Sequence, residues 1–352
     1  MTSDAPDTAY VWIWLPDHTE PVVAGRLDRR PGQGHNGADR FEFVYGRSYL
    51  DRPNAVPIYA PELPLDDRVH LPLDGDIPLC IDDTAPDSWG RAVINTKLGR
   101  PGDELDPLTY LLESGSDRVG ALDYQRSPSH YSPRNPVHAP IEQLQHFADL
   151  VASGEAVDPD LADALAHGTP LGGARPKALI HDNGVAKLAK FSKSTETFLW
   201  VQSEYVAMTL ARRVGINAAA ADYLETAGRS TLLVDRFDRH PNGTRQRVVS
   251  AATILGMQSM IAARHFSYIE LADEIRARFV NPADTLRELY GRIVFNILVG
   301  NTDDHARNHA AFWDGRMLTL TPAYDLCPQL RTGTAANQSM HLTRHGERAS
   351  QL

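Results

Sequence analysis

The fold is decided by the stretch Asn301-Thr302-Asp303-Asp304-His305-Ala306-Arg307-Asn308. Asp303 and Asn308 stand five residues apart, a spacing at which a carboxylate accepts the proton of an attacking hydroxyl and an amide oxygen holds magnesium. Phosphoryl transfer depends mainly on positioning and on neutralising phosphate charge. The stretch therefore predicts a phosphoryl-transfer centre. On spacing alone an alternative stays open, in which Asp303 and Asp304 cap a helix and Asn308 is a loop residue.

Downstream of this stretch, the sequence offers a second oxygen ligand for magnesium. A strand over residues 317–321 is expected to leave a turn at Asp314-Gly315 and to lead into Pro322-Ala323-Tyr324-Asp325. Carboxylate and amide oxygens are the hard ligands that Mg²⁺ prefers, and nucleotide phosphates can complete its octahedron. Asn308 and Asp325 are therefore the predicted metal ligands.

Two charged residues far upstream fit the same chemistry. Lys190 lies near the end of an apolar strand, Val185 to Phe191, where a lysine can pair with the donor phosphates. Glu204 lies on the helix expected from about Leu199 to Val214, where its carboxylate can orient that lysine. Lys and Glu are usually exposed surface residues, so this pair indicates a phosphate site only in combination with Asp303.

The loop before this strand is rich in glycine and basic residues. Its sequence is Gly168-Thr169-Pro170-Leu171-Gly172-Gly173-Ala174-Arg175-Pro176-Lys177. Small residues let backbone amides approach phosphates closely, which makes this loop a candidate nucleotide-binding segment. The Gly-Lys-Ser/Thr ending and the following helix of a Walker A loop are missing, and P-loop hydrolases are therefore disfavoured. The candidate binding residues here are Gly172, Gly173, Ala174, Arg175 and Lys177.

The order of predicted elements divides the chain into three units. Residues 1–126 are expected to form short strands, among them residues 41–45 and 55–59, and one helix over residues 87–98. Pro, Ser and His residues between positions 127 and 140 mark an exposed connection.

The second unit, residues 140–240, is expected to begin with a helix near residues 141–153 and to contain a hairpin at Asn183-Gly184. The third unit, residues 241–352, is expected to be mainly helical, and one of its helices begins at Asn281-Pro282. This order allows a two-lobed kinase preceded by an extra domain.

Composition limits the classes of function. The formal net charge is -10, which disfavours a sequence-independent grip on nucleic acid over the whole surface. Only two cysteines, Cys80 and Cys327, occur beside fourteen histidines, so a disulfide framework and a Cys-based zinc site are poorly supported. The polar N-terminus is unlike a signal peptide, and no stretch approaches about 18 apolar residues. We expect a soluble, cytoplasmic protein without a membrane partner.

Taken together, these stretches resemble the HipA family of toxin kinases. The resemblance rests on residues 300–308, on Tyr324-Asp325, on residues 171–177 and on Asp235-Arg236-Phe237-Asp238-Arg239. It extends into the first unit through residues 86–91 and 117–122. It implies an α+β, two-lobed protein-kinase-like fold, with a mixed N-lobe and a mainly helical C-lobe, preceded by a small strand-rich N-terminal domain.

The resemblance also implies roles for single residues. Asp303 would be the catalytic base, Asn308 and Asp325 the magnesium ligands, and Lys190 the phosphate-binding lysine. Residues 234–237 would form the adenine-side hinge, with Asp235, Arg236 and Phe237 among the nucleotide contacts. His305 is expected to shape the catalytic loop. The implied cofactors are ATP and Mg²⁺, and the implied partners are a protein substrate with a Ser or Thr acceptor and a HipB-like antitoxin that carries any contact with DNA.

Two departures from the family pattern affect these expectations. Pro170 occupies the position of a serine that some family members phosphorylate on themselves, and Thr169 is the nearest hydroxyl. Family members also usually continue for several helices beyond the Tyr-Asp element, whereas this chain ends at Leu352, which predicts a shortened C-lobe with uncovered apolar surface.

Two other functions stay open. A truncated or inactive relative would bind nucleotide and act as a regulator or partner. A metal-dependent phosphohydrolase would combine Asp303, Asp304, His305, His309 and Asp325, but it leaves Lys190 and Glu204 unexplained.

Overall fold

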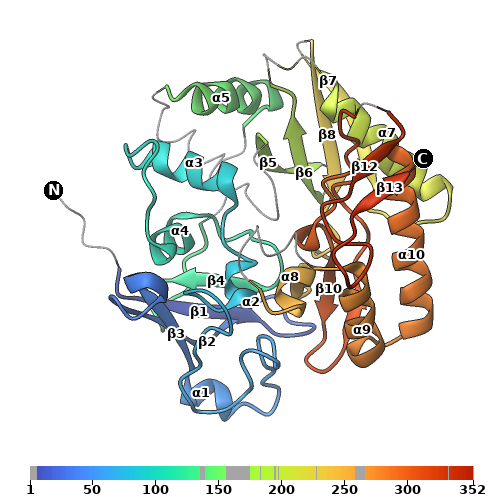
Figure 1. The fold of residues 1–352 in the computed structure, drawn as a ribbon. Coiled ribbons are helices and arrows are strands. Elements are labelled where there is room, and N and C mark those ends of the chain that lie inside the picture. Colours follow the sequence, from blue (N-terminus) through green and yellow to red (C-terminus); the bar gives the residue numbers. More distant parts are fainter. Residues whose placement is uncertain are drawn as a thin grey trace.

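The computed structural model describes residues 6–134, 139–155, 175–182, 184–193, 196, 198–226, 228–257, 266–331 and 333–351. Figure 1 shows one antiparallel sheet at the lower left, a second sheet at the top, and the helices of the C-terminal region at the right. No helix in these described ranges is both long and apolar enough to cross a membrane.

The first sheet has the strand order β3-β2-β1-β4, and all of its neighbours are antiparallel. Its strands are β1 (Thr8–Trp14), β2 (Pro21–Arg30), β3 (Arg40–Tyr45) and β4 (Leu122–Gln125). The strand predicted over residues 41–45 is thus confirmed. Four helices lie between β3 and β4: α1 (Arg47–Leu50), α2 (Leu79–Asp82), α3 (Ser88–Lys97) and α4 (Pro107–Glu113).

The strand predicted over residues 55–59 is wrong, because tyrosine hydroxyls take the place of a neighbouring strand. The Tyr49 hydroxyl donates to the Val56 carbonyl oxygen at 2.7 Å and accepts from the Val56 amide at 3.3 Å. The Tyr45 hydroxyl accepts from the Ile58 amide at 2.8 Å. Pro57 has no amide hydrogen to offer a ladder. Backbone pairing of the strand type in this segment is therefore limited to an isolated antiparallel bridge between Tyr59 and Leu63.

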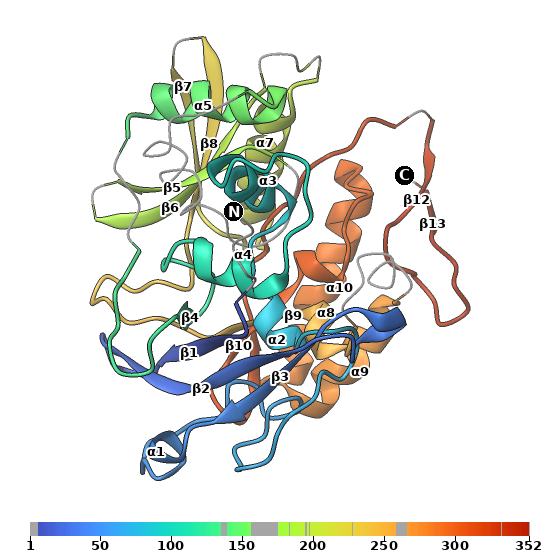
Figure 2. The ribbon, with the colours of Figure 1, turned by 90° about the vertical axis from the view of Figure 1, so that its left-hand side faces the viewer.

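The second sheet has the order β5-β6-β8-β7 and carries a helical layer on each face. Its strands are β5 (Lys177–Asp182), β6 (Val185–Phe191), β7 (Ala221–Thr226) and β8 (Arg229–Asp235). The predicted hairpin is confirmed, since β5 pairs with β6 in antiparallel register. Figure 2 shows this sheet above the first one.

Successive side chains of β8 point to opposite faces of the sheet, and each face is covered by its own helical layer. Leu232 and Val234 pack with α7 (Trp200–Arg213), while Leu233 packs with α3 and with α5 (Ile141–Ser153). Successive side chains of a strand point to opposite faces of its sheet. The helix predicted over residues 87–98 is confirmed as α3, and the Asp87 side chain caps it by accepting from the Gly90 amide at 2.9 Å. It covers the second sheet, however, although it lies in the first unit of the sequence.

The C-terminal region begins with helices, as predicted, but its later part forms strands. Helix α10 starts at Pro282 as expected, and Ser267 and Glu270 form a capping box at the start of α9. From His309 onward the described chain contains strands in place of further helices. The elements are β9 (Val248–Ser250), α8 (Ala251–Ile254), α9 (Tyr268–Arg278), α10 (Pro282–Val299), β10 (Ala310–Trp313), β11 (Leu318–Leu320), β12 (Ala335–Asn337) and β13 (Ala349–Gln351).

The first sheet and the C-terminal region share one hydrophobic core. The rings of Tyr59 and Trp313 lie 5.3 Å apart, edge to face. Arg278 of α9 donates to the Tyr59 hydroxyl at 2.9 Å. Because apolar side chains from both regions are buried together, the first sheet is a fixed part of the molecule and not a loosely attached domain.

Candidate active site

A lysine on a central strand of the second sheet joins three distant parts of the chain. Lys190 Nζ lies 2.6 Å from Glu204 Oε1 on α7 and 2.6 Å from Asp325 Oδ1. Asp325 is 135 residues away in sequence. The sequence pattern along β6 places Lys190 between the buried residues Ala189 and Phe191. The structure thus brings together the three charged groups that the sequence associated with phosphate and metal binding.

Burial and charge act in opposite directions in this cluster. Burial disfavours the charged lysine, but the carboxylates of Asp325 and Glu204 outweigh it and raise the pKa of Lys190. Burial raises the pKa of Asp325 as well, but the Lys190 ammonium lowers it more, and the net pKa lies below the usual value. Burial keeps the pKa of Glu204 above its usual value. One cation therefore faces two carboxylates.

The backbone holds Asp325 in an uncommon conformation. Its φ is 57°, in the left-handed region that residues other than glycine seldom occupy. The preceding Ala323 is fixed on both sides, because its amide donates to the Asn217 carbonyl at 2.7 Å and its carbonyl accepts from the Ala219 amide at 2.9 Å. Such local strain is typical of functional positions, and here it accompanies a carboxylate aimed at Lys190.

The two adjacent carboxylates of the Asp303-Asp304 pair have different surroundings. Asp304 is 1% exposed and accepts from the Tyr268 hydroxyl at 2.7 Å, with His309 Nε2 at 2.9 Å from the same oxygen. Although burial opposes it, the neighbouring His309 lowers the pKa of Asp304. Asp303 is exposed. Asp304 therefore fixes the loop from within, and Asp303 is the carboxylate that a substrate can reach.

The helix-cap alternative for these residues is wrong. The helical element that directly follows them is a short 3-10 turn, Ala306–Asn308, which begins after His305 and has no side-chain cap. Asn308 Nδ2 donates to the Asp303 carbonyl at 3.3 Å, so the two residues at the five-residue spacing are in contact.

The oxygen donors of this region fit a hard cation. Asn308 Oδ1 is buried and accepts no hydrogen bond in the described structure. The Tyr324 hydroxyl donates to the Arg307 carbonyl at 2.8 Å, which ties the turn of Asn308 to the segment of Asp325. An amide oxygen without a donor and a carboxylate are the ligands that Mg²⁺ prefers, and Asn308 and Asp325 would hold it.

A cluster for the phosphohydrolase alternative is not found. Within the described ranges, no group of three or more His, Cys, Asp or Glu side chains is placed to hold a metal. His309 is engaged with Asp304, and Asp325 with Lys190. His305 is buried, and its Nδ1 has no hydrogen-bond partner.

An apolar pocket lies next to Lys190. Phe237 forms part of it, and the Phe237 ring lies 5.8 Å from the rings of both Phe312 and Tyr324. The side chains of Asp235 and Arg236 pair with other residues, Asp235 with Lys187 at 2.7 Å, so their backbone is what they offer to a ligand. The lining residues are Val119, Leu188, Lys190, Val234, Asp235, Arg236, Phe237, Asp238, Tyr324 and Asp325.

Only part of the predicted glycine-rich loop lies within the described residues. Gly172, Gly173 and Ala174, like Thr169 and Pro170, lie outside the described residues. Lys177 is buried in β5 and paired with Asp87, yet it lies near enough to Asp325 to lower the pKa of that carboxyl. Arg175 stacks over the Trp200 ring at 4.4 Å. Neither Lys177 nor Arg175 lines the apolar pocket.

Several pocket residues were missed by the sequence analysis. Leu188 has a usable signal, because it lies two positions before Lys190 and so shares its face of the strand. Val119 lies in the 117–122 stretch that carries the family resemblance, but this stretch precedes the hinge by more than a hundred residues, and no sequence pattern placed it at the pocket.

These features define an α+β, kinase-like fold, with a buried lysine, its paired glutamate and an aspartate around an apolar pocket. HipA of Shewanella oneidensis, solved in a complex with HipB and its operator DNA, has this fold. The TM-score is 0.67 at 20% identity, and the match covers 94% of this chain and 79% of that one. The predicted fold class is thus confirmed.

Family comparisons agree with this fold. A model described as the HipA-like C-terminal domain matches residues 169–352, and one described as the HipA N-terminal domain matches residues 19–125. The chain therefore belongs to the HipA family, as the resemblance predicted.

Two curated proteins are similar to this chain in sequence. Y4mE of Sinorhizobium fredii is 25% identical over 310 residues, which are 81% of this chain and 71% of Y4mE. The serine/threonine-protein kinase toxin HipA of Shewanella oneidensis is 30% identical over 144 residues, which are 36% of this chain and 33% of that protein. The matched region thus spans only a third of that toxin.

Proposed function

We propose that this protein transfers the γ-phosphoryl group of ATP to a Ser or Thr hydroxyl of a cellular protein. The observation that carries the proposal is the double contact of Lys190 with Glu204 and Asp325, each at 2.6 Å. In protein kinases, a strand lysine paired with a helix glutamate holds the donor phosphates. The family membership of the chain supports the same reading.

The proposed chemistry assigns a task to each residue. The apolar pocket beside Phe237 receives the adenine base, and Lys190 neutralises phosphate charge. Asn308 and Asp325 would hold Mg²⁺, which when bound would neutralise phosphate charge. Asp303 accepts the proton of the substrate hydroxyl as its oxygen bonds to the γ-phosphorus and the bond from that phosphorus to the ADP oxygen breaks.

The proposal includes a partner that restrains the kinase. The related HipA of Shewanella oneidensis was solved with HipB and operator DNA. By analogy, we propose a HipB-like antitoxin for this chain and contact with DNA only through it, which agrees with the formal charge of -10. We place the protein in the cytoplasm, where its two buried, unbridged cysteines would stay reduced.

The proposal is tested by phosphoryl transfer with three proteins. Purified wild-type protein, Asp303→Ala and the control Asp67→Ala are each incubated with labelled ATP and Mg²⁺ in a cell lysate, and phosphorylated Ser and Thr residues are located by mass spectrometry. Asp67 is an exposed aspartate outside the site. We expect transfer by wild type and Asp67→Ala, and a loss of about 100-fold or more in Asp303→Ala, since general bases contribute about that much.

Other outcomes separate the alternatives. Binding of ATP without transfer by the folded wild-type protein would favour the regulator reading. No binding of ATP at all would show that the site is wrongly assigned.

A further inference from the structure

We infer that Val119, which lies in the N-terminal region of the chain, is a specificity-determining wall of the nucleotide pocket, held in place by a clamp between residues 117–120 and 236–239. The inference rests on the proposed ATP binding and adds to it a contribution from outside the two kinase lobes. Val119 lines the same pocket as Leu188, Phe237 and Tyr324.

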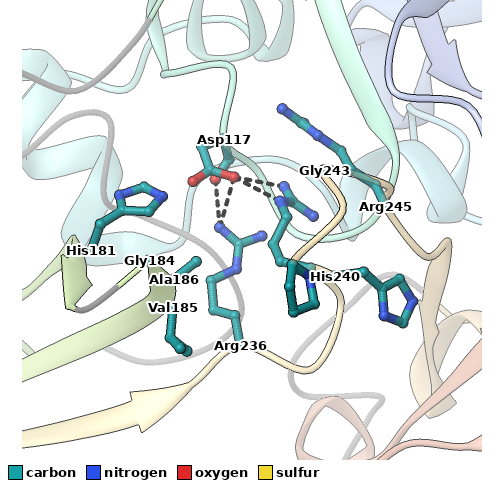
Figure 3. A pocket seen from close by; sticks show the side chains of 11 residues that line it. Asp117, His181, Gly184, Val185, Ala186, Arg236, His240, Gly243 and Arg245 are labelled. Carbon is teal, nitrogen blue, oxygen red and sulfur yellow. Dashed lines mark hydrogen bonds and ion pairs between the residues drawn. The ribbon is translucent and has the colours of Figure 1, made fainter.

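One half of the clamp is made by Arg236. Its Nη1 donates to the Asp117 carbonyl at 3.0 Å and to Asp117 Oδ1 at 2.9 Å, and its Nη2 donates to the Arg118 carbonyl at 2.6 Å. Figure 3 shows the Asp117 carboxylate pointing at the Arg236 guanidinium across the space beside the turn between β5 and β6. A planar guanidinium that binds a carboxylate and two carbonyls fixes both position and orientation.

The other half of the clamp is made by Arg239 and Asp238. Arg239 Nε donates to Asp117 Oδ1 at 2.9 Å, and Arg239 Nη1 donates to the Gly120 carbonyl at 2.8 Å. Asp238 Oδ2 accepts from the Gly120 amide at 2.7 Å. The residues on both sides of Val119 are thus bonded to residues 236–239, Arg118 to Arg236 and Gly120 to Asp238 and Arg239.

A glycine is needed at position 120, where the chain passes close to the backbone of Val248. The φ of Gly120 is 76°, and a Cβ added there would lie 3.3 Å from the Val248 amide nitrogen. Only glycine adopts this conformation without strain and leaves the room that the backbone contact requires.

Within the clamp every charged group is paired with an opposite one, while Arg245 lies beside it and its charge also lowers the pKa of Asp117. Two carboxylates, Asp117 and Asp238, face two guanidiniums, Arg236 and Arg239. Burial opposes the charged form of Arg236, but Asp117 and Asp238 raise its pKa. Since the guanidinium donors also reach the backbone carbonyls of Asp117, Arg118 and Gly120, the cluster fixes the position of this segment of the chain.

Val119 itself offers apolar contact. It is 5% exposed and belongs to a small buried cluster with Val248 and Ala310. Phe237, Phe312 and Tyr324 pack against this cluster, and Phe237 is the hinge residue of the pocket. A flat aromatic base in the pocket would therefore touch Val119, and the volume of this side chain would decide how tightly the base is held.

The inference is tested by measuring ATP affinity of the full-length chain in the presence of Mg²⁺ by titration calorimetry. We expect Val119→Ala, which removes two methyl groups from a hydrophobic pocket, to weaken ATP binding about tenfold or more, and Val119→Phe to weaken it further by filling the space. The matched control is Val69→Ala, which changes an exposed valine in the same region of the chain. Thermal unfolding of each variant shows whether it is folded. If Val119→Phe does not fold, the ATP affinity of Val119→Ala alone tests the inference.

A second pair of variants tests the clamp as a positioning device. Asp117→Asn should raise the KM for ATP about fivefold or more, within the usual range of coupling between sites, and Asp117→Glu should recover part of the loss. A purely structural role would lower the thermal stability of both variants without this selective recovery.

Two results would overturn the inference, and they are distinguishable. If wild type binds ATP and both Val119 variants bind it as tightly as Val69→Ala, Val119 is no part of the pocket, while the proposed function stands. If wild type binds no ATP, the inference and the proposed function fail together.

Discussion

Two buried charge clusters join distant parts of this molecule, and they differ in how completely their charges are matched. In the first, the Lys190 ammonium faces the carboxylates of Glu204 and Asp325. In the second, the carboxylates of Asp117 and Asp238 face the guanidiniums of Arg236 and Arg239. The first has one cation for two anions, and the second has two for two.

The difference teaches what each cluster is for. Under the proposed function, Asp325 of the first cluster and the oxygen of Asn308, which accepts no hydrogen bond, would hold Mg²⁺, and Lys190 would face the phosphates. The balanced cluster instead fixes one backbone segment against another. Under this proposal, the unevenly paired cluster serves the chemistry and the evenly paired cluster serves positioning, although both are buried.

The largest expected effect comes from removing the cation of the unbalanced cluster. Lys190→Met should reduce phosphoryl transfer by at least about 100-fold, because a fixed charge at the phosphates is lost. It should also lower the free energy of unfolding by about 3–5 kcal/mol, because two buried carboxylates lose their partner. ATP turnover measures the loss of phosphoryl transfer, and urea unfolding measures the loss of stability.

A double variant separates these two effects. Lys190→Met with Glu204→Gln removes one carboxylate together with the lysine, so part of the lost stability should return while transfer stays absent. If Lys190→Met transfers phosphate as fast as the wild-type protein, the charge of Lys190 is not needed for transfer. The difference between the two clusters would then not explain function.

An intermediate effect is expected at the two neighbouring carboxylates of the catalytic loop. Asp304→Asn should lower the free energy of unfolding by about 1–3 kcal/mol, because the bonds to Tyr268 and His309 are weakened in a buried place. The exposed Asp303→Asn should change stability by no more than about 0.5 kcal/mol. Urea unfolding of the two variants side by side measures the contrast, and equal losses would refute the assignment of separate tasks.

The smallest effect is expected in how the free energy of unfolding depends on pH through Asp117 of the second cluster. Burial alone would raise the pKa of Asp117, but Arg236 and Arg239 hold it well below its usual range. Because the folded pKa is depressed, the stabilisation is fully present above the unfolded value of about 4 and is lost as the pH falls through the folded value.

Asp117→Asn removes this acid dependence. The loss of stability between about pH 5 and pH 3 should be smaller in Asp117→Asn than in wild type by on the order of 1 kcal/mol. Thermal unfolding at both pH values measures the difference, and identical pH profiles would show that Asp117 titrates normally.

Much of the local structure was predictable from short stretches. The hairpin of β5 and β6, the cap of α3 at Asp87 and the start of α10 at Pro282 all follow from neighbouring residues. The strand expected over residues 55–59 failed for a non-local reason, since its backbone groups are bonded to hydroxyls of Tyr45 and Tyr49.

The candidate site was predictable in residue type but not in arrangement. The five-residue spacing of Asp303 and Asn308 identified the loop, yet it did not tell which of Asp303 and Asp304 is exposed. That choice depends on Tyr268 of α9, which buries Asp304 from outside the motif.

By itself, the sequence determined several secondary elements, among them the hairpin of β5 and β6, α3 and α10, and it identified the charged residues that the structure brings together, because periodicity, turns and motif spacing are properties of neighbouring residues. Only the tertiary structure decided that Asp325 meets Lys190 across 135 residues, and that Val119 reaches the pocket through the clamp at Arg236. Such contacts depend on the packing of whole sheets and helices, and a linear pattern carries no record of the distance between them.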